Sequence, residues 1–439
     1  MLKNVRGSKD YLPEEQMIRN RIKSVLEDAF QRYAFMPLET TTICYLDLLS
    51  SKYAGGAEIM KEVYKLNDQG GRELGLRYDL TVPFAKIVGM NPNLQMPFKR
   101  YEIGKVYRDG PVKKGRLREF YQCDVDVVGV SSMIAEAEYM SMVFDVFEKL
   151  ELDVYVSYNN RKLLYGILVG VGAEQDQIND GILALDKVEK IGKDGVRKEL
   201  IAKEFSEEVI GRLFEIVDQK DSIDLEFFRT KFDNDFVKEG IAELEELNGF
   251  LETLGIKDKV RLNPFLARGL DIYTGTVFEI FISDGSMRSS IGAGGRYDKI
   301  IGAFLDNGKE YPAVGISFGL DVIYTVLLER QKGMKQSLID VLVVPMGTES
   351  YSLKVANKLR ESGYKVEVNL GGGKLKKIFN RADKNGVPYV IVVGENEVEK
   401  GEVSIKDMRT GESETVAVND IGGFEGKSVS NGFQQPVSR

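Results

Sequence analysis

The sequence predicts an α+β protein: an antiparallel sheet domain, interrupted by a helical segment and followed by a small α/β domain. Three observations support this prediction. Strand patterns with hairpin-type turns occupy the first 160 residues and return near residue 260. The intervening segment, 161–255, shows helical periodicity alone. A short alternation of strands and helices then fills 338–425, which is a normal size for a compact domain.

Length, charge and cysteine content limit the class of protein. The 439 residues are enough for two to three domains. The formal net charge of −8 excludes a generally basic nucleic-acid coat, but it allows a local basic groove. No apolar run is long enough to cross a membrane, and the N-terminus lacks the apolar core of a signal peptide. The two cysteines, Cys44 and Cys123, form no CxxC pair, which predicts a reducing, cytoplasmic compartment without structural disulfides or a zinc site.

The chain contains no histidine. A histidine-dependent catalytic triad, an imidazole general base and a histidine-ligated metal are therefore excluded. Any chemistry must rest on arginine, lysine, carboxylates, tyrosine, or a metal held by oxygen atoms.

The first elements follow from local signals. Pro13 suits a first helical turn, and Glu14 and Glu15 complement the positive end of a helix that the apolar spacing extends to about Tyr33. Asp68 to Gly71 has the composition of a hairpin turn. The remaining elements of this part are a strand running into a helix over 74–88, with the change near Asp79 or Thr81, two strands within 98–128, a helix over 133–150 and a strand over 154–158.

The hairpin at 98–126 carries the clearest functional signal. Its segment 99–118 holds eight basic residues against two acidic ones in an otherwise acidic chain. Arg108 stands in an apolar strand pattern, where an unpaired charge is costly. Gln122, Asp124 and Asp126 recur at period two and so share one face of a strand. The pattern indicates either a site for a nucleotide and a small cationic or amphoteric molecule, or a solvated basic hairpin.

After the helical segment the strand patterns resume. The predicted elements are strands over 260–264, 273–282, 287–291 and 313–318 with a helix over 320–330, then a polar linker to 337, strands over 339–345, 365–370 and 389–394 with helices about 350–361 and 375–385, two short strands near Val403 and Thr415, and a disordered tail over 426–439. The basic helix at 375–385 suits RNA backbone contact or is a solvated helix face.

Two glycine-rich stretches resemble nucleotide motifs without their context. Gly422 to Ser428 lacks the first glycine, the strand and the helix of a phosphate loop. Gly292 to Asp298 lacks the strand–loop–helix context of a dinucleotide site. Its glycines predict either close approach of the backbone to a ligand or a neighbouring strand, or a β-bulge.

Four stretches together carry a family resemblance. They are LRYDLTVPF (76–84), YRDGPVKKGRLREFYQCDVD (107–126), LARGLDIYTGTVFE (266–279) and GAGGRYD (292–298). With the N-terminal RGSKDYLP, this series closely resembles the histidyl-tRNA synthetases of class II. The resemblance implies a catalytic core with a six-stranded antiparallel sheet at 1–160 and 256–330, a helical insertion at 161–255, an anticodon-binding α/β domain at 338–425, and a homodimer.

The resemblance also implies the role of individual residues. Arg108 and Arg268 would be catalytic, on opposite sides of the ATP α-phosphate. The expected contacts are, for histidine, Asp79, Thr81, Gln122, Asp126, Tyr273, Gly294 and Tyr297; for ATP, Arg108, Arg116, Arg118, Phe120, Arg268 and Gly319; and for tRNA, Lys113, Lys114, Lys374, Lys377 and Arg381. Mg²⁺ would accompany ATP, with no metal held by histidine or cysteine.

The chain departs from the family pattern at several positions. Asp321-Val322 stands where the third class II motif usually has Glu-Arg, and Gly110 where many class II enzymes have Glu. Ile272 replaces the first of two tyrosines, and the motif 1 proline would fall near Thr40. These departures keep a second function open, namely a catalytically silent paralogue that senses histidine or tRNA, or a regulatory subunit of ATP phosphoribosyltransferase. Such subunits generally lack the C-terminal domain that this chain has.

Overall fold

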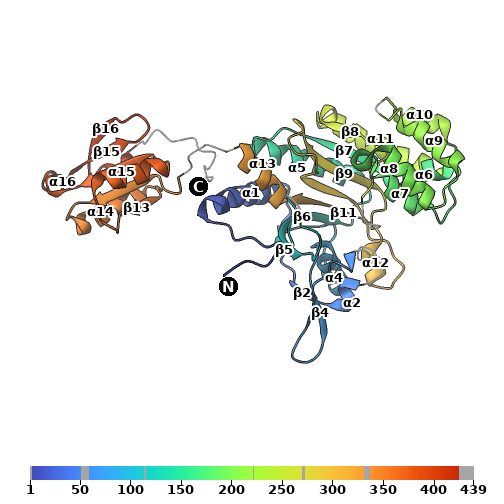
Figure 1. Cartoon of the computed structure of the whole chain (residues 1–439), viewed down its shortest axis with the longest axis horizontal. Helices are drawn as coiled ribbons and strands as arrows, with labels where there is room; N and C mark the ends of the chain where they lie inside the picture. Colours follow the sequence, from blue (N-terminus) through green and yellow to red (C-terminus); the bar gives the residue numbers. More distant parts are fainter. Residues whose placement is uncertain are drawn as a thin grey trace. The chain divides into compact units, whose positions relative to one another are not determined.

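The computed structural model describes residues 2–50, 59–112, 115–220, 222–268, 272–330 and 337–424. The chain divides into two compact units (Figure 1). The larger unit holds the residues up to Asp10 and Ile22–Leu327, and the smaller unit holds Tyr11–Arg21 and the residues from Leu328 onward.

An eight-stranded sheet forms the centre of the larger unit. Its strand order is β1-β5-β6-β11-β10-β9-β7-β8. The six inner strands pair antiparallel throughout, whereas β1 and β8 pair parallel at the two edges. The predicted antiparallel domain is thus confirmed, with two edge strands added to the expected six. The strands are β1 Met36–Pro37, β5 Phe98–Tyr107, β6 Glu119–Val128, β7 Val154–Asn160, β8 Val260–Leu262, β9 Thr276–Ile282, β10 Gly292–Arg296 and β11 Ala313–Gly319.

Two helices pack on one face of this sheet, namely the part of α1 (Pro13–Arg32) from Ile22 onward and α5 (Ile134–Lys149) (Figure 1). Phe318 of β11 lies between them, with its ring centroid 5.8 Å from that of Phe30 and 6.1 Å from that of Phe147. The Tyr139 hydroxyl also donates to Val314 O at 3.1 Å. Because side chains alternate along a strand, the neighbours of these apolar residues point to the opposite face, which is left for polar groups.

A smaller sheet has the strand order β2-β4-β3. Its strand β4 leads into helix α4, and this part of the chain covers the polar face of the larger sheet. The predicted turn between β3 and β4 is confirmed, since Gly71 N–H donates to Asp68 O at 3.0 Å. The strand expected from residue 74 begins one residue earlier, and the helix begins at Thr81 as predicted. These elements are β2 Ile43–Tyr45, α2 Leu46–Ser50, β3 Lys65–Asn67, β4 Glu73–Leu76 and α4 Thr81–Met90.

The described residues within 161–253 form helices and the connections between them, as the periodicity predicts. Side-chain caps begin four of them, because Asn160, Ser206, Asp224 and Asn234 each accept a hydrogen bond from a backbone N–H of the first turn. The helices are α6 Arg161–Gly170, α7 Ile178–Leu185, α8 Val188–Ala202, α9 Glu207–Val217, α10 Leu225–Lys231 and α11 Asp235–Thr253.

The strand predicted at 287–291 was wrong, and the glycine-rich run after it forms the central strand β10. This strand lies between β9 and β11, where the backbones approach too closely for side chains. A Cβ on Gly294 would lie 2.2 Å from Gly315 O. The glycines therefore serve close strand approach, and the alternative of a β-bulge is incorrect. Two further helices are α12 Ile300–Phe304 and α13 Leu320–Arg330, and the last three residues of α13 belong to the smaller unit.

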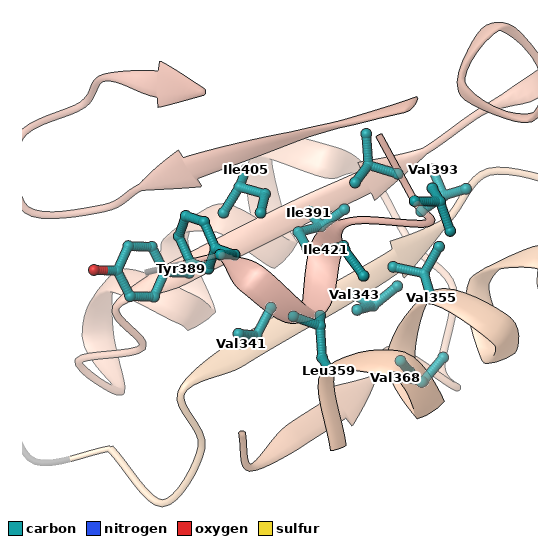
Figure 2. Packing of buried hydrophobic residues seen from close by; sticks show 14 residues of the cluster. Val341, Val343, Val355, Leu359, Val368, Tyr389, Ile391, Val393, Ile405 and Ile421 are labelled. Carbon is teal, nitrogen blue, oxygen red and sulfur yellow. The ribbon is translucent and has the colours of Figure 1, made fainter. Parts of the chain in front are cut away.

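The smaller unit has a five-stranded sheet of order β13-β12-β14-β15-β16. The parallel pairing of β12 with β13 and β14 confirms the predicted βαβαβ arrangement, and β15 and β16 extend it antiparallel. Figure 2 shows Val343 and Ile391 of the sheet beside Val355 and Leu359 of α14. The tail predicted at 426–439 lies outside the described residues. The elements are β12 Val341–Pro345, α14 Glu349–Glu361, β13 Val366–Val368, α15 Leu375–Lys384, β14 Tyr389–Val393, α16 Glu395–Lys400, β15 Glu402–Asp407 and β16 Ser413–Ala417.

Replacing Gly294 with alanine should lower the free energy of unfolding by about 1–3 kcal/mol, because the added methyl group meets a backbone oxygen that cannot move away. Denaturant unfolding of the whole chain measures the change. Gly249→Ala is the matched control, since Gly249 lies exposed in α11 with open space around it and should gain about 0.5–1 kcal/mol. Equal midpoints for the two variants would contradict the steric role of Gly294.

Candidate active site

The polar face of the sheet is built on the hairpin of β5 and β6. Gln122, Asp124 and Asp126 share one face of β6, as their spacing predicts. The hairpin register places Glu102 opposite Asp124 and Arg100 opposite Asp126. The hairpin therefore brings together carboxylates and an arginine, and Asp124 and Asp126 are 3% exposed.

Arg100 is the central cation of this face, and sequence reasoning missed it. Its side chain is fully buried, and Nη2 lies 2.7 Å from Asp126 Oδ2. The same nitrogen donates to Leu80 O at 3.3 Å, and the guanidinium lies over the Phe84 ring at 4.3 Å. Its signal in the sequence was its place opposite Asp126 in the hairpin, which becomes visible only when the register is known.

A second ion pair lies beside the first. Arg77 Nη1 is 2.7 Å from Glu102 Oε1 and donates to Thr40 O at 2.8 Å. The Thr40 hydroxyl donates to the same Glu102 carboxylate. Thr40, where the motif 1 proline would fall, thus connects the segment after β1 to the hairpin.

Asp126 is held on both oxygens. Arg100 pairs with Oδ2, and the Tyr297 hydroxyl donates to Oδ1. Burial raises the pKa of Asp126, and Arg100 and Tyr297 oppose that rise. Gly315 leaves room for the carboxylate, since a Cβ there would lie 2.0 Å from Asp126 Oδ1. Asp126 and Tyr297, both expected at the histidine site, therefore lie together.

Gly294, expected at the histidine site, lies on the glycine-rich strand β10. Its missing side chain would point toward Phe278, on the face opposite to Asp126. Gly295 is the glycine of β10 on the site face, because a Cβ there would lie 2.8 Å from the Tyr273 ring. The sequence could not show to which face of the sheet each glycine belongs, and a contact of Gly294 with histidine stays a prediction.

Asp79 and Arg108 meet where β4 leads into α4. The Val82 N–H donates to Asp79 Oδ1 at 3.0 Å, and burial raises the pKa of Asp79 to about 6. Arg108 Nε donates to Tyr78 O at 2.9 Å, and burial lowers the pKa of Arg108 while Asp79 opposes this. The Arg108 guanidinium lies 5.3 Å from the centre of the half-buried Phe120 ring.

Arg268 lies farther across the same face. Its Nη1 is 2.5 Å from Glu279 Oε1, and its Nε is buried without a hydrogen-bond partner among the described residues. Glu279 stands opposite Ala293, which stands opposite Ser317, which stands opposite Asp124. Arg268 therefore belongs to the polar face that the hairpin begins.

The basic loop is tied to its own surroundings. Arg116 Nη2 lies 2.8 Å from Glu62 Oε1, and Arg118 Nη1 lies 2.9 Å from Asp109 Oδ1. A Cβ on Gly110 would lie 2.6 Å from the same Glu62 oxygen. The carboxylate missing at Gly110 is thus supplied by Glu62, which sequence reasoning missed. Lys113 and Lys114 lie outside the described residues.

The departure in the third motif has a structural role. Asp321 lies in the first turn of α13, is buried, and accepts a hydrogen bond from Tyr121 N–H at 3.0 Å. A Cβ on Gly319 would lie 3.4 Å from Val322 Cγ2, so Val322 packs by van der Waals contact beside that glycine. Ile272, the other departure, packs in an apolar cluster beside Tyr273 and Tyr297.

The residues expected to bind tRNA lie on helix α15 of the smaller unit. Lys374 at its N-cap and Lys377 are exposed. Arg381 Nη2 donates to Glu367 Oε1 at 3.0 Å and to Asn369 Oδ1 at 3.2 Å. The helix therefore presents lysines freely, while its arginine is partly engaged.

An antiparallel sheet with buried arginines and carboxylates on one face, entered through a basic hairpin, defines the catalytic domain of a class II aminoacyl-tRNA synthetase. A family model described as histidyl-tRNA synthetase matches residues 7–323, and one described as anticodon binding domain matches residues 340–424. The chain belongs to the histidyl-tRNA synthetase family.

Relatives and solved structures agree with this assignment. Histidine–tRNA ligase 1 of Bacillus cereus (strain ATCC 10987 / NRS 248) is 53% identical over 421 residues, which cover 96% of each chain. Histidine–tRNA ligase of Clostridium tetani (strain Massachusetts / E88) is 38% identical, covering 94% of this chain and 95% of its own. The crystal structure of histidyl-tRNA synthetase from Nostoc sp. PCC 7120 superposes with a TM-score of 0.84 at 30% identity, covering 96% of this chain and 98% of the other.

Replacing Asp124 with asparagine should change how stability depends on pH. Burial, reinforced by Asp126, raises the pKa of Asp124 from 3.8 to about 8. Between these values the folded state holds more protons than the unfolded state, so the free energy of unfolding of the unmodified protein falls as pH rises. Asp124→Asn removes this loss, and its stability relative to the unmodified protein should rise by up to about 3 kcal/mol from pH 5.5 to pH 8.5.

Urea unfolding at several pH values measures this difference. Asp258→Asn, which removes an exposed carboxyl group of the same unit, is the control and should give a curve parallel to that of the unmodified protein. A pH-independent effect of Asp124→Asn would show that the carboxyl group is ionised throughout.

Proposed function

We propose that this protein ligates L-histidine to tRNA(His) in two steps, with ATP as the co-substrate and histidyl-adenylate as the intermediate. The observation that carries the proposal is the polar sheet face with Arg108 and Arg268, within a chain that belongs to the histidyl-tRNA synthetase family. The match of residues 340–424 to an anticodon-binding domain supports tRNA as the acceptor.

In the first step, the histidine carboxylate attacks the α-phosphorus of ATP and pyrophosphate leaves. Negative charge on the phosphate oxygens is stabilised by Arg108 and Arg268, which are fixed in place before the reaction by Tyr78 O and by Glu279. Phe120 offers a ring face for adenine, and Arg116, Arg118 and Gly319 line the phosphate side. In the second step, a terminal ribose hydroxyl of tRNA attacks the acyl carbonyl group and AMP leaves.

The histidine pocket would bind the α-ammonium group of the substrate at one end and its imidazole ring at the other. Asp79 and Thr81 suit the α-ammonium group, since a carboxylate and a hydroxyl both accept its hydrogen bonds. Gln122 can donate a hydrogen bond to the amino acid and accept one from it. Asp126 and Tyr273 suit the two ring nitrogens. A site that satisfies both ring nitrogens rejects apolar isosteres, because its own buried polar groups would be left unpaired.

Mg²⁺ would arrive with ATP. Among the described residues, no group of three histidine, cysteine, aspartate or glutamate side chains could hold a metal ion. Mg²⁺ is commonly held largely by substrate phosphates and water, where it neutralises phosphate charge. These residues do not form a dedicated metal site, and we assign no step of the reaction to the ion.

We further propose a cytoplasmic homodimer. Neither Cys44 nor Cys123 is in a disulfide, which supports a reducing compartment. None of the helices in the described part of the chain is long and apolar enough to cross a membrane. Met36, Ile43 and Tyr45 of the larger unit are exposed apolar residues, and a dimer contact there would remove them from water.

A regulatory or sensor function is the second candidate, because Asp321 and Val322 provide no cation where the third motif usually has arginine. The C-terminal domain match argues against it. Exchange of pyrophosphate into ATP separates the two: the synthetase proposal requires exchange that depends on L-histidine. Histidine binding without exchange or tRNA charging would favour the regulatory function.

Arg268→Ala should lower histidine-dependent exchange by about 100- to 1,000-fold, because one cation on the α-phosphate is lost. Arg268→Lys should recover part of that activity. Arg229→Ala removes an exposed arginine that pairs within the insertion and should leave exchange unchanged. Near-normal exchange by a folded Arg268→Ala variant, checked by its melting temperature, would remove Arg268 from the mechanism.

Replacing both Lys374 and Lys377 with glutamate should weaken tRNA binding, raising KM for tRNA at least about tenfold, because two phosphate contacts become repulsive. The salt dependence of binding should also become shallower. Pyrophosphate exchange needs no tRNA, so it serves as the internal reference. Lys354→Glu combined with Lys400→Glu, which changes two exposed lysines on α14 and α16 of the same unit, is the charge-matched control. Unchanged charging by the double variant would place the tRNA elsewhere.

A further inference from the structure

A carboxyl group of the helical insertion contacts the segment that carries Arg268. Asp186 directly follows α7, and its Oδ1 accepts a hydrogen bond from Ala267 N–H at 3.1 Å. The two residues are 81 positions apart, so this bond joins the insertion to the sheet domain. Ala267 is buried and directly precedes Arg268. A buried backbone N–H needs a hydrogen-bond partner, and Asp186 supplies it.

The sheet also holds this segment, a few atoms earlier in the chain. The Asn159 side chain on β7 is buried and donates to Pro264 O at 3.0 Å and to Leu266 O at 2.9 Å. These two bonds fix the backbone up to Leu266, and Asp186 then binds the next residue. The backbone that leads into Arg268 is therefore held both by a strand of the sheet and by the insertion.

The guanidinium of Arg268 is held separately from its backbone. Its Nη1 lies 2.5 Å from Glu279 Oε1, and a side-chain hydrogen bond joins it to Tyr273. Asp186, Arg268 and Glu279 line one cavity of about 960 Å³ between the insertion and the sheet face. Because Glu279 and Tyr273 belong to other parts of the chain, the guanidinium keeps its place only if the backbone at Ala267 keeps its own.

An ion pair gives Asp186 a second contact. Lys190 Nζ lies 3.6 Å from Asp186 Oδ2, and the lysine side chain is 70% exposed, whereas that of Asp186 is 19% exposed. Ion pairs with so much exposure contribute little to stability. Burial raises the pKa of Asp186, but a carboxyl group keeps an accepting oxygen whether it is ionised or protonated. The bond to Ala267 N–H is therefore the contact with a structural consequence.

We propose that Asp186 is a positioning residue, which fixes the backbone of Arg268 through Ala267 N–H and so makes adenylate formation depend on the helical insertion. This inference rests on the proposed function, in which Arg268 stabilises charge on the α-phosphate. Asp186 acts through Arg268 and makes no contact with the reacting atoms. The insertion is then part of the machinery of the first step.

Histidine-dependent pyrophosphate exchange by the full chain measures the effect. Asp186→Ala should lower kcat about 10- to 100-fold and change KM for histidine little, because a misplaced arginine weakens binding of the transition state alone. Asp186→Asn keeps an oxygen that accepts from an N–H and should retain most of the rate. Two controls should leave exchange unchanged: Lys190→Ala removes only the ion pair, and Asp180→Ala removes an aspartate of α7 that pairs with Lys203.

A double-mutant cycle separates positioning from general structural support. In the Arg268→Ala background, Asp186→Ala should lower exchange by less than about twofold, since its effect passes through an arginine that is already absent. An equal loss in both backgrounds would overturn the inference, and so would an equal loss in Asp186→Asn and Asp186→Ala. Asp186→Ser, whose side chain is shorter, replaces the alanine variant if that variant does not fold.

Amide hydrogen exchange, measured by mass spectrometry on a peptide that contains Ala267, tests the contact without relying on activity. This amide should exchange faster in Asp186→Ala than in the unmodified protein, and Asp180→Ala should leave it unchanged. Equal protection in all three proteins would overturn the inference. If the unmodified protein showed no histidine-dependent pyrophosphate exchange, the proposed function would fail, and the amide measurement would still decide whether Asp186 holds the segment.

Discussion

The buried pairing of Arg100 with Asp126 is the interaction on which the site depends. A guanidinium without exposure is tolerated only when carboxylates and a carbonyl oxygen replace its water. Arg100 meets these requirements at Nη2, which links Asp126 of β6 to Leu80, just before α4, while its Nε and Nη1 are buried without a hydrogen-bond partner among the described residues. Removing it would leave the Asp126 carboxylate buried and unpaired, which typically costs 3–5 kcal/mol. The sheet face and the segment that covers it are therefore joined by charge as well as by packing.

Electrostatics also explains why this face is polar in a sheet whose other face is apolar. Arg100 and Arg77 share Glu102 as a neighbour, and Thr40 completes the second pair. Without these cations, still fewer of the carboxyl groups crowded on two strands could ionise. Acidic side chains are therefore tolerated on this face only near the arginines. A substrate with an ammonium group adds a further positive charge beside these carboxyl groups.

Much of the fold could be predicted from the sequence. Helices as long as α5 and those of the insertion show a clear apolar period, which identifies them as helices. The face of each β6 residue also followed from a period of two. The strand β10 could not be predicted, because three glycines and one small alanine at 292–295 show no alternation of polar and apolar side chains. Arg100 was missed for another reason: its partner, Asp126, is distant along the chain, and only the hairpin register joins them.

Glu62 and Arg116, which meet beside Gly110, are 54 positions apart in the chain. A motif scored position by position counts Gly110 as a loss, although the carboxylate is present in space. Because the carboxylate comes from Glu62 and not from position 110, these two positions depend on each other. A side chain restored at 110 would collide with Glu62 unless Glu62 were replaced by a shorter residue in the same lineage. Substitutions at positions 62 and 110 are therefore expected to occur together during evolution. Either substitution alone would give a less fit protein, whichever of the two came first.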